Sequence, residues 1–437
     1  MGILLKSVKV VDPSGPHHGK VRDVLIGKGV IEKIAKDLPV AGHKLVDLKG
    51  ALVSPGWVDM CARFGDPGFE YREDLVSGTE AAAAGGFTHV VVMPGNDPVT
   101  DNKASIEYLY RRSAGLSAAL LPLGTISRQM AGKQLADMYD MHDAGAVGFS
   151  DDHQNVSTEL MMRALDYARN FDGLIYSFPH DVASSRGGQM HEGPVSVSLG
   201  LKGIPSMSEE LRLHRDIELL RYTGGRMHVT ALSTARGVEM VRKAKKDKLN
   251  ITASVAAHQL LLTEEALLGF DQQAKVLPPF RSSRDAEALI RGVADGTIDT
   301  ICSDHTPLEI ELKDCEFDHA TPGISSIQVV WNVLCSAVSD KIETEVLVQR
   351  LYGNSRNILG LPALHIDTGA PAHLTLFSDK GTTEVQRNTW KSKSFNSPFL
   401  GKSLRGIVYG TVYSDGTLSR LSLRSTKVDR KGLLTGQ

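Results

Sequence analysis

The chain has 437 residues, of which 41% are hydrophobic and 23% charged, and its formal net charge is −2. This length predicts either several domains or one large α/β barrel with additions. A balanced charge without a long basic block gives no electrostatic case for binding nucleic acid or an anionic membrane surface. We also find no apolar run long enough to cross a bilayer and no signal-peptide core. The four cysteines form no Cys-x-x-Cys pair, which predicts free thiols and a cytoplasmic protein.

The two ends of the chain carry strand signals. Short apolar or alternating runs at 3–11, 24–26 and 31–34 are separated by turns rich in Gly, Pro and Asp. Similar runs return at 373–377 and 406–412. We therefore expect the segments 1–54 and 365–437 to combine in one composite β-sandwich domain.

Between these ends, residues 55–364 alternate strand-like apolar runs with helix-like amphipathic runs. The expected strands are 89–93, 118–125, 148–150, 174–177, 228–232, 251–255 and 300–302. The expected helices are 102–113, 133–144, 158–170, 207–222, 234–246 and 285–292. This alternation is typical of a parallel sheet covered by helices. About eight such units in roughly 300 residues predict the α/β class and a (β/α)8 TIM-like barrel.

Functional residues of such a barrel belong at the carboxyl ends of its strands. Polar or unusual residues follow several of the expected strands, namely Asp59, Cys61, Arg63, Asp151, Asp152, His180, His228, His258 and Asp304. An acid, a thiol and a guanidinium on one strand are an uncommon combination.

Many short motifs occur in order along nearly the whole chain. They lie at 67–68, 73–74, 77–78, 83–88, 93–94, 149–152, 190–193, 199–201, 215–217, 262–266, 278–281, 295–299, 303–305 and 394–401. In these motifs the chain resembles the dihydroorotases of the amidohydrolase superfamily, of the type associated with aspartate carbamoyltransferase. The resemblance implies a hydrolase of pyrimidine biosynthesis, in which two zinc ions activate the hydroxide that attacks a cyclic amide.

The first strand departs from the family pattern. Family members end this strand with Asp-x-His-x-His, because alternate residues of a strand point the same way and both imidazoles reach the metal pair. In this sequence the two histidine positions hold Cys61 and Arg63. Cys61 remains a possible zinc ligand as a thiolate, whereas the permanently charged Arg63 has no lone pair to donate.

Other ligand positions are altered too. The fifth-strand position aligns with Phe178, although a local shift would allow His180 to serve, and Ala231 replaces the second histidine of the sixth strand. The carboxylates remain: Asp152 is the expected bridging ligand, and Asp304 keeps the position that in the family binds metal and shuttles protons. The degenerate ligand positions are thus Cys61, Arg63, Phe178 and Ala231.

The positions that hold the substrate in the family have changed in parallel. Where the resemblance places an Arg, two Asn and a His, this sequence has Gly65, Gly95, Leu277 and Leu308. A substrate carboxylate would therefore lose its bidentate partner.

These losses suggest a role for Arg63. We hypothesise that its guanidinium lies among Asp59, Asp152 and Asp304 and replaces the charge of the metals structurally. The sequence then predicts a pseudo-dihydroorotase in which Asp304 is inactive and zinc is absent or only partly bound. Such a protein would serve as a scaffold for aspartate carbamoyltransferase or an active dihydroorotase, and we expect it to be a homo-oligomer.

Two alternatives remain open. One is a working cyclic amidohydrolase, a dihydroorotase or a hydantoinase- or allantoinase-type enzyme, with one metal held by Cys61, His180 and Asp304. The other is a protein that binds a small molecule in the emptied pocket. Turnover with added metal separates the first alternative from the scaffold, and a ligand-dependent melting shift without turnover indicates the second.

Overall fold

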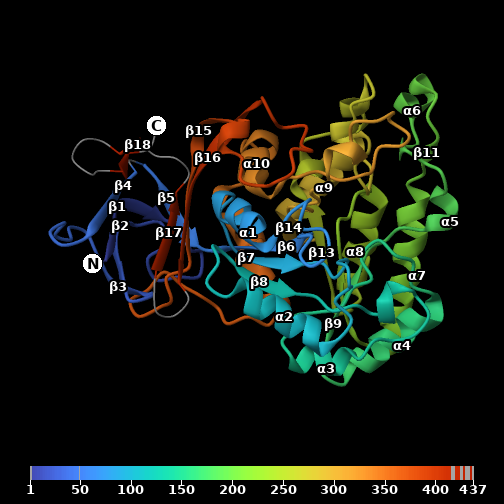
Figure 1. Cartoon of the computed structure of the whole chain (residues 1–437), viewed down its shortest axis with the longest axis horizontal. Helices are drawn as coiled ribbons and strands as arrows, with labels where there is room; N and C mark the ends of the chain where they lie inside the picture. The colour runs from blue at the N-terminus through green and yellow to red at the C-terminus, as the bar shows by residue number, and fades with distance from the viewer. Residues whose placement is uncertain (1, 49, 415–418, 424–426, 429–433, 436–437) are drawn as a thin grey trace.

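The structure, a computed structural model, describes residues 2–48, 50–414, 419–423, 427–428 and 434–435. Figure 1 shows a sheet built from both ends of the chain beside a body of strands surrounded by helices. Among the described residues, no helix has the length and apolar character that spanning a membrane requires.

The sheet beside the barrel contains ten strands from the two ends of the chain. The amino-terminal strands are β1 (Ile3–Val10), β2 (Val21–Gly27), β3 (Val30–Ala35), β4 (Lys44–Asp47) and β5 (Leu52–Pro55). The carboxyl-terminal strands are β15 (Leu374–Glu384), β16 (Ser403–Ser414), β17 (Ser419–Leu423), β18 (Lys427–Val428) and β19 (Leu434–Thr435). Strand β5 joins the two sets, because it pairs in parallel with β1 and antiparallel with β15. The two ends thus form one sheet, and the exact domain limits stay a prediction.

Seven named strands form the barrel, and all of their pairings are parallel. They are β6 (Trp57–Ala62), β7 (Phe87–Val92), β8 (Ala119–Pro122), β9 (Leu174–Ser177), β12 (Arg226–Val229), β13 (Ile251–Ala256) and β14 (Thr300–Cys302). Phe149 forms parallel bridges with Gly124 and with Ile175, so its segment takes the place of the missing strand between β8 and β9. A further bridge from Ala62 to His305 closes the ring between β6 and the end of β14. The predicted barrel class is confirmed.

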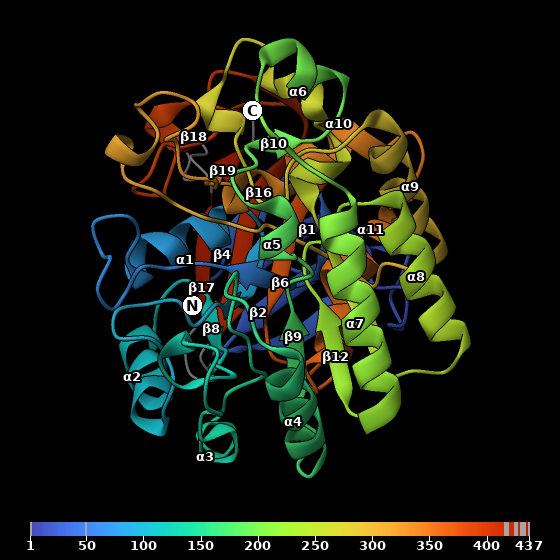
Figure 2. The same ribbon diagram turned by 90° about the vertical axis from the view of Figure 1, so that its right-hand side faces the viewer.

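Helices surround this ring, as Figure 2 shows for the face formed by α4, α7 and α8. They are α1 (Leu75–Ala84), α2 (Lys103–Ser113), α3 (Met138–Asp143), α4 (Thr158–Arg169), α5 (Val182–Ser185), α6 (Pro194–Leu199), α7 (Met207–Thr223), α8 (Ala235–Lys246), α9 (Ser283–Asp295), α10 (Val330–Val338), α11 (Thr344–Leu351) and α12 (Gly353–Ile358). The short pair β10 (Met190–His191) and β11 (Gly203–Ile204) lies in the segment between β9 and α7. Asn102, Ser157 and Thr234 begin their helices by accepting hydrogen bonds from free backbone N–H groups.

One predicted helix is shorter than its pattern suggested. We expected a helix over 133–144, but α3 begins only at Met138. The preceding residues pair with the loop after β8 instead: Leu135 forms an antiparallel bridge with Ser127. The N–H of Arg128 also donates to the Gln134 carbonyl at 2.9 Å. These contacts use the backbone of 134–135, so the helix starts later.

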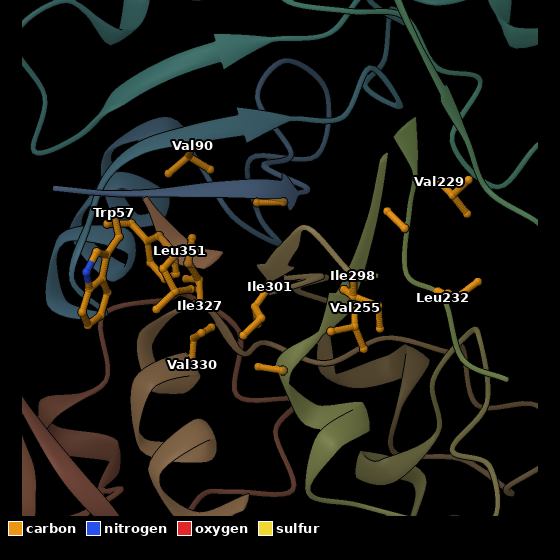
Figure 3. Close-up of a cluster of buried hydrophobic side chains, with 14 of the residues drawn as sticks. Trp57, Val90, Val229, Leu232, Val255, Ile298, Ile301, Ile327, Val330 and Leu351 are labelled. Atoms are coloured by element: carbon orange, nitrogen blue, oxygen red, sulfur yellow. The ribbon is translucent and has the colours of Figure 1, made fainter. Parts of the chain in front are cut away.

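An aromatic cluster joins the barrel to the terminal sheet. Trp57, at the start of β6, is fully buried, and its ring centroid lies 5.2 Å from that of Trp331 and 5.1 Å from that of Phe377. Figure 3 shows Trp57 at one end of the buried side chains that line the barrel, close to Ile327 and Val330. Buried aromatic rings contribute strongly to packing energy. The strand that leads to Arg63 is therefore fixed at its first residue by a large shared core.

Candidate functional site

Arg63 lies just beyond the end of β6, at the carboxyl end of the barrel. Its Nε and Nη2 atoms donate to the two oxygens of Asp152 at 2.9 and 2.6 Å. Its Nη1 atom donates to Asp304 Oδ1 at 2.8 Å and to Thr306 Oγ1 at 2.9 Å. Nη2 also contacts His153 Nε2 at 2.8 Å, and because a guanidinium only donates, this nitrogen accepts. The contacts match the five N–H groups of the guanidinium, which joins the tips of three barrel strands.

The charge balance of the site favours ionised Asp152. Burial alone would raise the pKa of its carboxyl, but the charge and hydrogen bonds of Arg63, together with the neighbouring His153, lower that pKa to about 2. The side chains of Arg63 and Asp152 are 18% and 11% exposed, so water screens this pair only weakly. The guanidinium thus lies beside two of the three expected carboxylates, Asp152 and Asp304, and its role in place of metal charge stays a prediction.

The third expected carboxylate, Asp59, has a different partner. It is fully buried and accepts hydrogen bonds from the backbone N–H of Ser303 at 2.8 Å and from the Ser303 hydroxyl. Burial raises the pKa of Asp59 to about 7, although the Ser303 hydrogen bonds act in the opposite direction. Asp59 therefore connects β6 to the end of β14 and does not need Arg63.

Replacing Asp59 by Asn is expected to change how stability depends on pH. The folded pKa, about 7, is above the ordinary aspartate pKa of 3.8, so between these values the folded protein holds a proton that the unfolded chain has released. The wild type therefore loses up to about 1.4 kcal/mol of stability per unit as pH rises through this window. Urea unfolding is measured at pH 4.5, 5.5, 6.5 and 7.5. The free energy of unfolding of Asp59→Asn, relative to that of the wild type, should rise at each step. Asp340→Asn, at an exposed carboxylate, is the matched control, and parallel curves for Asp59→Asn and wild type would contradict the assignment.

Cys61 lies two residues before Arg63. Because alternate residues of an extended chain point the same way, both side chains lie on the same face. Its thiol donates to Asp304 Oδ1 at 3.7 Å. Burial raises the pKa of Cys61 well above its usual value, more than Arg63 lowers it. The side chain is only 1% exposed and belongs to a buried apolar cluster with Met60 and Cys302. In this state Cys61 is a neutral thiol within the barrel.

The remaining ligand positions are apolar or engaged elsewhere. The ring of Phe178 lies against His153, with centroids 4.4 Å apart. His180 follows it, but its Nε2 atom pairs with the Ser185 hydroxyl at 2.8 Å, and burial lowers its pKa to about 4. Ala231 is buried and offers no donor. Whether His180 binds a metal stays a prediction.

The former substrate positions differ in the space they offer. A Cβ atom at Gly65 would lie 2.3 Å from the Phe69 carbonyl oxygen, so no side chain fits there. Gly95 is open, because a Cβ there would come no closer than 3.5 Å, to Asp152 Oδ2. Leu277 is half-buried and Leu308 is buried. Of these four positions, therefore, only Gly95 is shown to have open space beside the carboxylate of Asp152.

The backbone at three strand ends is left-handed. The φ angles of Asp152, Ala231 and Asp304 are 49°, 53° and 50°. An aspartate tolerates this region better than an alanine, which has no polar side chain to compensate for the strain. Strained residues of this kind concentrate at functional sites. The two retained carboxylates, Asp152 and Asp304, and the altered position Ala231 thus share this backbone conformation.

Sequence reasoning missed two partners of Arg63, His153 and Thr306. Each lies within two residues of a carboxylate that we had identified, Asp152 and Asp304 respectively. This proximity was a usable signal, but the left-handed turn that directs each side chain toward Arg63 depends on the tertiary structure. Both residues extend the polar network around the guanidinium.

The resemblance implies zinc, and the donor set can be tested for a fit. Among the described residues there is no group of three His, Cys, Asp or Glu side chains placed to hold a metal ion. The guanidinium already uses both oxygens of Asp152 and one oxygen of Asp304. Because a cation and a metal ion would repel each other there, this arrangement does not fit a pair of zinc ions. The zinc occupancy itself stays a prediction.

Solved structures share the fold of this chain. In fold it is similar to the L-hydantoinase (dihydropyrimidinase) from Arthrobacter aurescens, with a TM-score of 0.82 at 21% identity, covering 96% of this chain and 98% of that one. It is also similar to the dihydropyrimidinase from Brevibacillus agri, with a TM-score of 0.78 at 19% identity, covering 99% and 96% of the two chains.

Sequence comparison narrows this class to one family. Residues 50–236 match the family described as dihydro-orotase-like. The chain is 41% identical to a dihydroorotase of Pelotomaculum thermopropionicum, covering 94% of this chain and 97% of that protein. It is 39% identical to a dihydroorotase of Carboxydothermus hydrogenoformans, with the same two coverages of 94% and 97%. The chain belongs to the dihydroorotase-like family, which confirms the resemblance seen in the sequence.

Proposed function

We propose that this chain is a non-catalytic member of the dihydroorotase-like family that acts in pyrimidine biosynthesis. The observation that carries this proposal is that the N–H groups of Arg63 are all hydrogen-bonded within the site. Their partners are Asp152, His153, Asp304 and Thr306. A metal-activated hydroxide needs concentrated positive charge and a free coordination position. Here one fixed guanidinium supplies the charge, and it has no means of ionising a water molecule. Asp304 then holds Arg63 and shuttles no proton.

In this proposal the protein acts as a scaffold or partner for aspartate carbamoyltransferase or for an active dihydroorotase. A partner role depends on the surface and the fold, both of which persist when the residues at the strand ends change. The proposal places the protein in the cytoplasm, in keeping with four cysteines that are all free in the structure.

Metal content and dihydroorotate hydrolysis, measured on the same preparation, test the loss of catalysis. We expect zinc well below one ion per chain and no turnover above background after addition of zinc, manganese or cobalt. The dihydroorotase of Pelotomaculum thermopropionicum, assayed in parallel, is the positive control. Stoichiometric zinc together with turnover would overturn the proposal.

A second experiment tests the partner role. Affinity-tagged protein is mixed with aspartate carbamoyltransferase from the same organism, and the complex is measured by light scattering and by carbamoyltransferase activity. We expect a defined complex or a change in carbamoyltransferase activity. Two separate, unaffected proteins would contradict this role.

The alternative function, a cyclic amidohydrolase with a single metal, has one supporting observation. The thiol of Cys61 and the carboxylate of Asp304 are neighbours, with Sγ and Oδ1 3.7 Å apart. The third ligand would be His180, which pairs with Ser185 in the structure. Turnover that depends on one metal per chain and disappears in Cys61→Ser would establish this alternative.

A further inference from the structure

A pocket lies at the amino end of the barrel, on the face opposite to the site around Arg63. It is formed where four neighbouring strands begin, namely β9, β12, β13 and β14, and α12 closes one side of it. Its volume is about 300 Å³, and its polar lining consists of Arg226, Asn250, Thr252, Asp299, Asn354 and Asn357. Catalytic residues of such barrels come from the carboxyl ends of the strands, so a pocket at this end is suited to binding.

The charged groups of the pocket already have partners. Arg226 donates to the Asp172 carboxylate at 2.7 Å, and to the backbone carbonyls of Asp172 and Ile358 at 2.8 Å each. Asp299 accepts from Lys245 Nζ at 2.6 Å. A charged ligand would lose its hydration here without gaining an unpaired opposite charge. The pocket therefore favours an uncharged ligand.

Three carboxamides give the pocket spare hydrogen-bonding capacity. The side chains of Asn250 and Asn357 are exposed and have no hydrogen-bond partner among the described residues. Asn354 donates one N–H to the Asp299 carbonyl at 2.8 Å and accepts from Gln349 at 3.2 Å, which leaves its second N–H available. The pocket thus offers neutral donors and acceptors side by side.

The inner wall of the pocket is apolar. Leu174, Met227 and Ile358 line it, and all three are buried. A ligand therefore meets carboxamides on one side and aliphatic groups on another, which suits a flat ring with polar groups on its edge. A cavity of about 150 Å³ holds a benzene molecule, so this pocket has room for one six-membered ring with its substituents.

From these features we infer that the pocket binds an uncharged pyrimidine base. The edge of such a base alternates N–H and C=O groups, and the carboxamides of Asn250 and Asn357 pair with an edge of this kind. The face of the ring lies against Leu174 and Ile358. This binding site is separate from the strand ends that carry Arg63, and it adds a small-molecule ligand to the proposed scaffold.

Isothermal titration calorimetry with uracil tests the inference on the full chain. We expect one site per chain. Asn250→Leu and Asn357→Leu should each raise the dissociation constant at least about fivefold, because each removes one carboxamide pair. 1,3-Dimethyluracil has the same ring without N–H groups and should bind more weakly by a similar factor. Both substituted residues are exposed, so the melting curves of the variants should stay cooperative.

A matched variant and a competitor separate this pocket from other sites. Asn388→Leu removes an exposed carboxamide between β15 and β16 and should bind uracil as the wild type does. Dihydroorotate carries a carboxylate and should not displace uracil. No binding of uracil at millimolar concentration would overturn the inference. Uracil binding that Asn250→Leu and Asn357→Leu leave unchanged, or that dihydroorotate abolishes, would place the base at the strand ends and would overturn it as well.

Discussion

Replacing Arg63 by Met is expected to lower the free energy of unfolding by about 3–5 kcal/mol at pH 7, because it leaves buried carboxylates without a counter-charge. The side chains of Asp152 and Asp304 are 11% and 7% exposed, so water cannot replace the guanidinium. Urea unfolding followed by circular dichroism measures the loss. Arg405→Met, which breaks an exposed ion pair with Asp340, is the matched control and should leave the unfolding midpoint nearly unchanged.

The pH dependence should change sign in the same variant. In the wild type the pKa of Asp152 is lowered to about 2, so its contribution is complete above about pH 4 and is lost as pH falls toward 2. Without Arg63, burial remains as the larger influence and raises this pKa. Arg63→Met should therefore become more stable, relative to wild type, as pH falls from 7 to 4. A constant difference across this range would show that Arg63 does not act through the charge of Asp152.

Restoring the two first-strand imidazoles is expected to create a zinc-dependent gain in stability. In Cys61→His/Arg63→His the imidazoles share one face of β6 with Asp304 and Asp152 nearby, which removes the guanidinium and supplies nitrogen ligands. At a zinc concentration 100 times the dissociation constant, the gain is about 2.7 kcal/mol. Thermal melting with and without zinc measures it, while the wild type should show no such shift.

The variant Cys61→His/Arg63→Met is the control for this experiment. It also removes the guanidinium but supplies only one imidazole, so its zinc response should be much weaker. The response of the two-imidazole variant should also fall between pH 7 and pH 5, because a protonated imidazole cannot bind metal. Equal zinc shifts in the two variants would show that the second position plays no part.

The sequence predicted the parts of the fold that depend on local patterns. The expected strands at 174–177 and 300–302 coincide with β9 and β14, because short buried parallel strands are continuous apolar runs. The expected strand at 148–150 does lie in the ring, although Phe149 forms only isolated bridges there. The helix expected from 133 failed at its start, where backbone pairing with Ser127 and Arg128 overrides the helical pattern.

At the site, charge was more predictable than geometry. Arg63 could be placed beside Asp152 and Asp304 from the sequence, since a cation in a buried group of carboxylates has few other stable positions. The separation of Asp59 from that group was not predictable, because it depends on the exact position of Ser303 across the ring. The lack of space for a side chain at Gly65 was not predictable either, because it depends on where the following loop places the Phe69 carbonyl.

The sheet that joins the two ends of the chain affects how the protein folds during synthesis. The N–H of Trp57 donates to the hydroxyl of Thr375, a residue 318 positions later. At 5–20 residues per second, a ribosome needs roughly 15–60 s to travel that distance. During that interval β5 lacks its neighbour β15 and exposes an unpaired edge. Until β15 has been made, a chaperone or another nascent copy can therefore bind the free edge of β5.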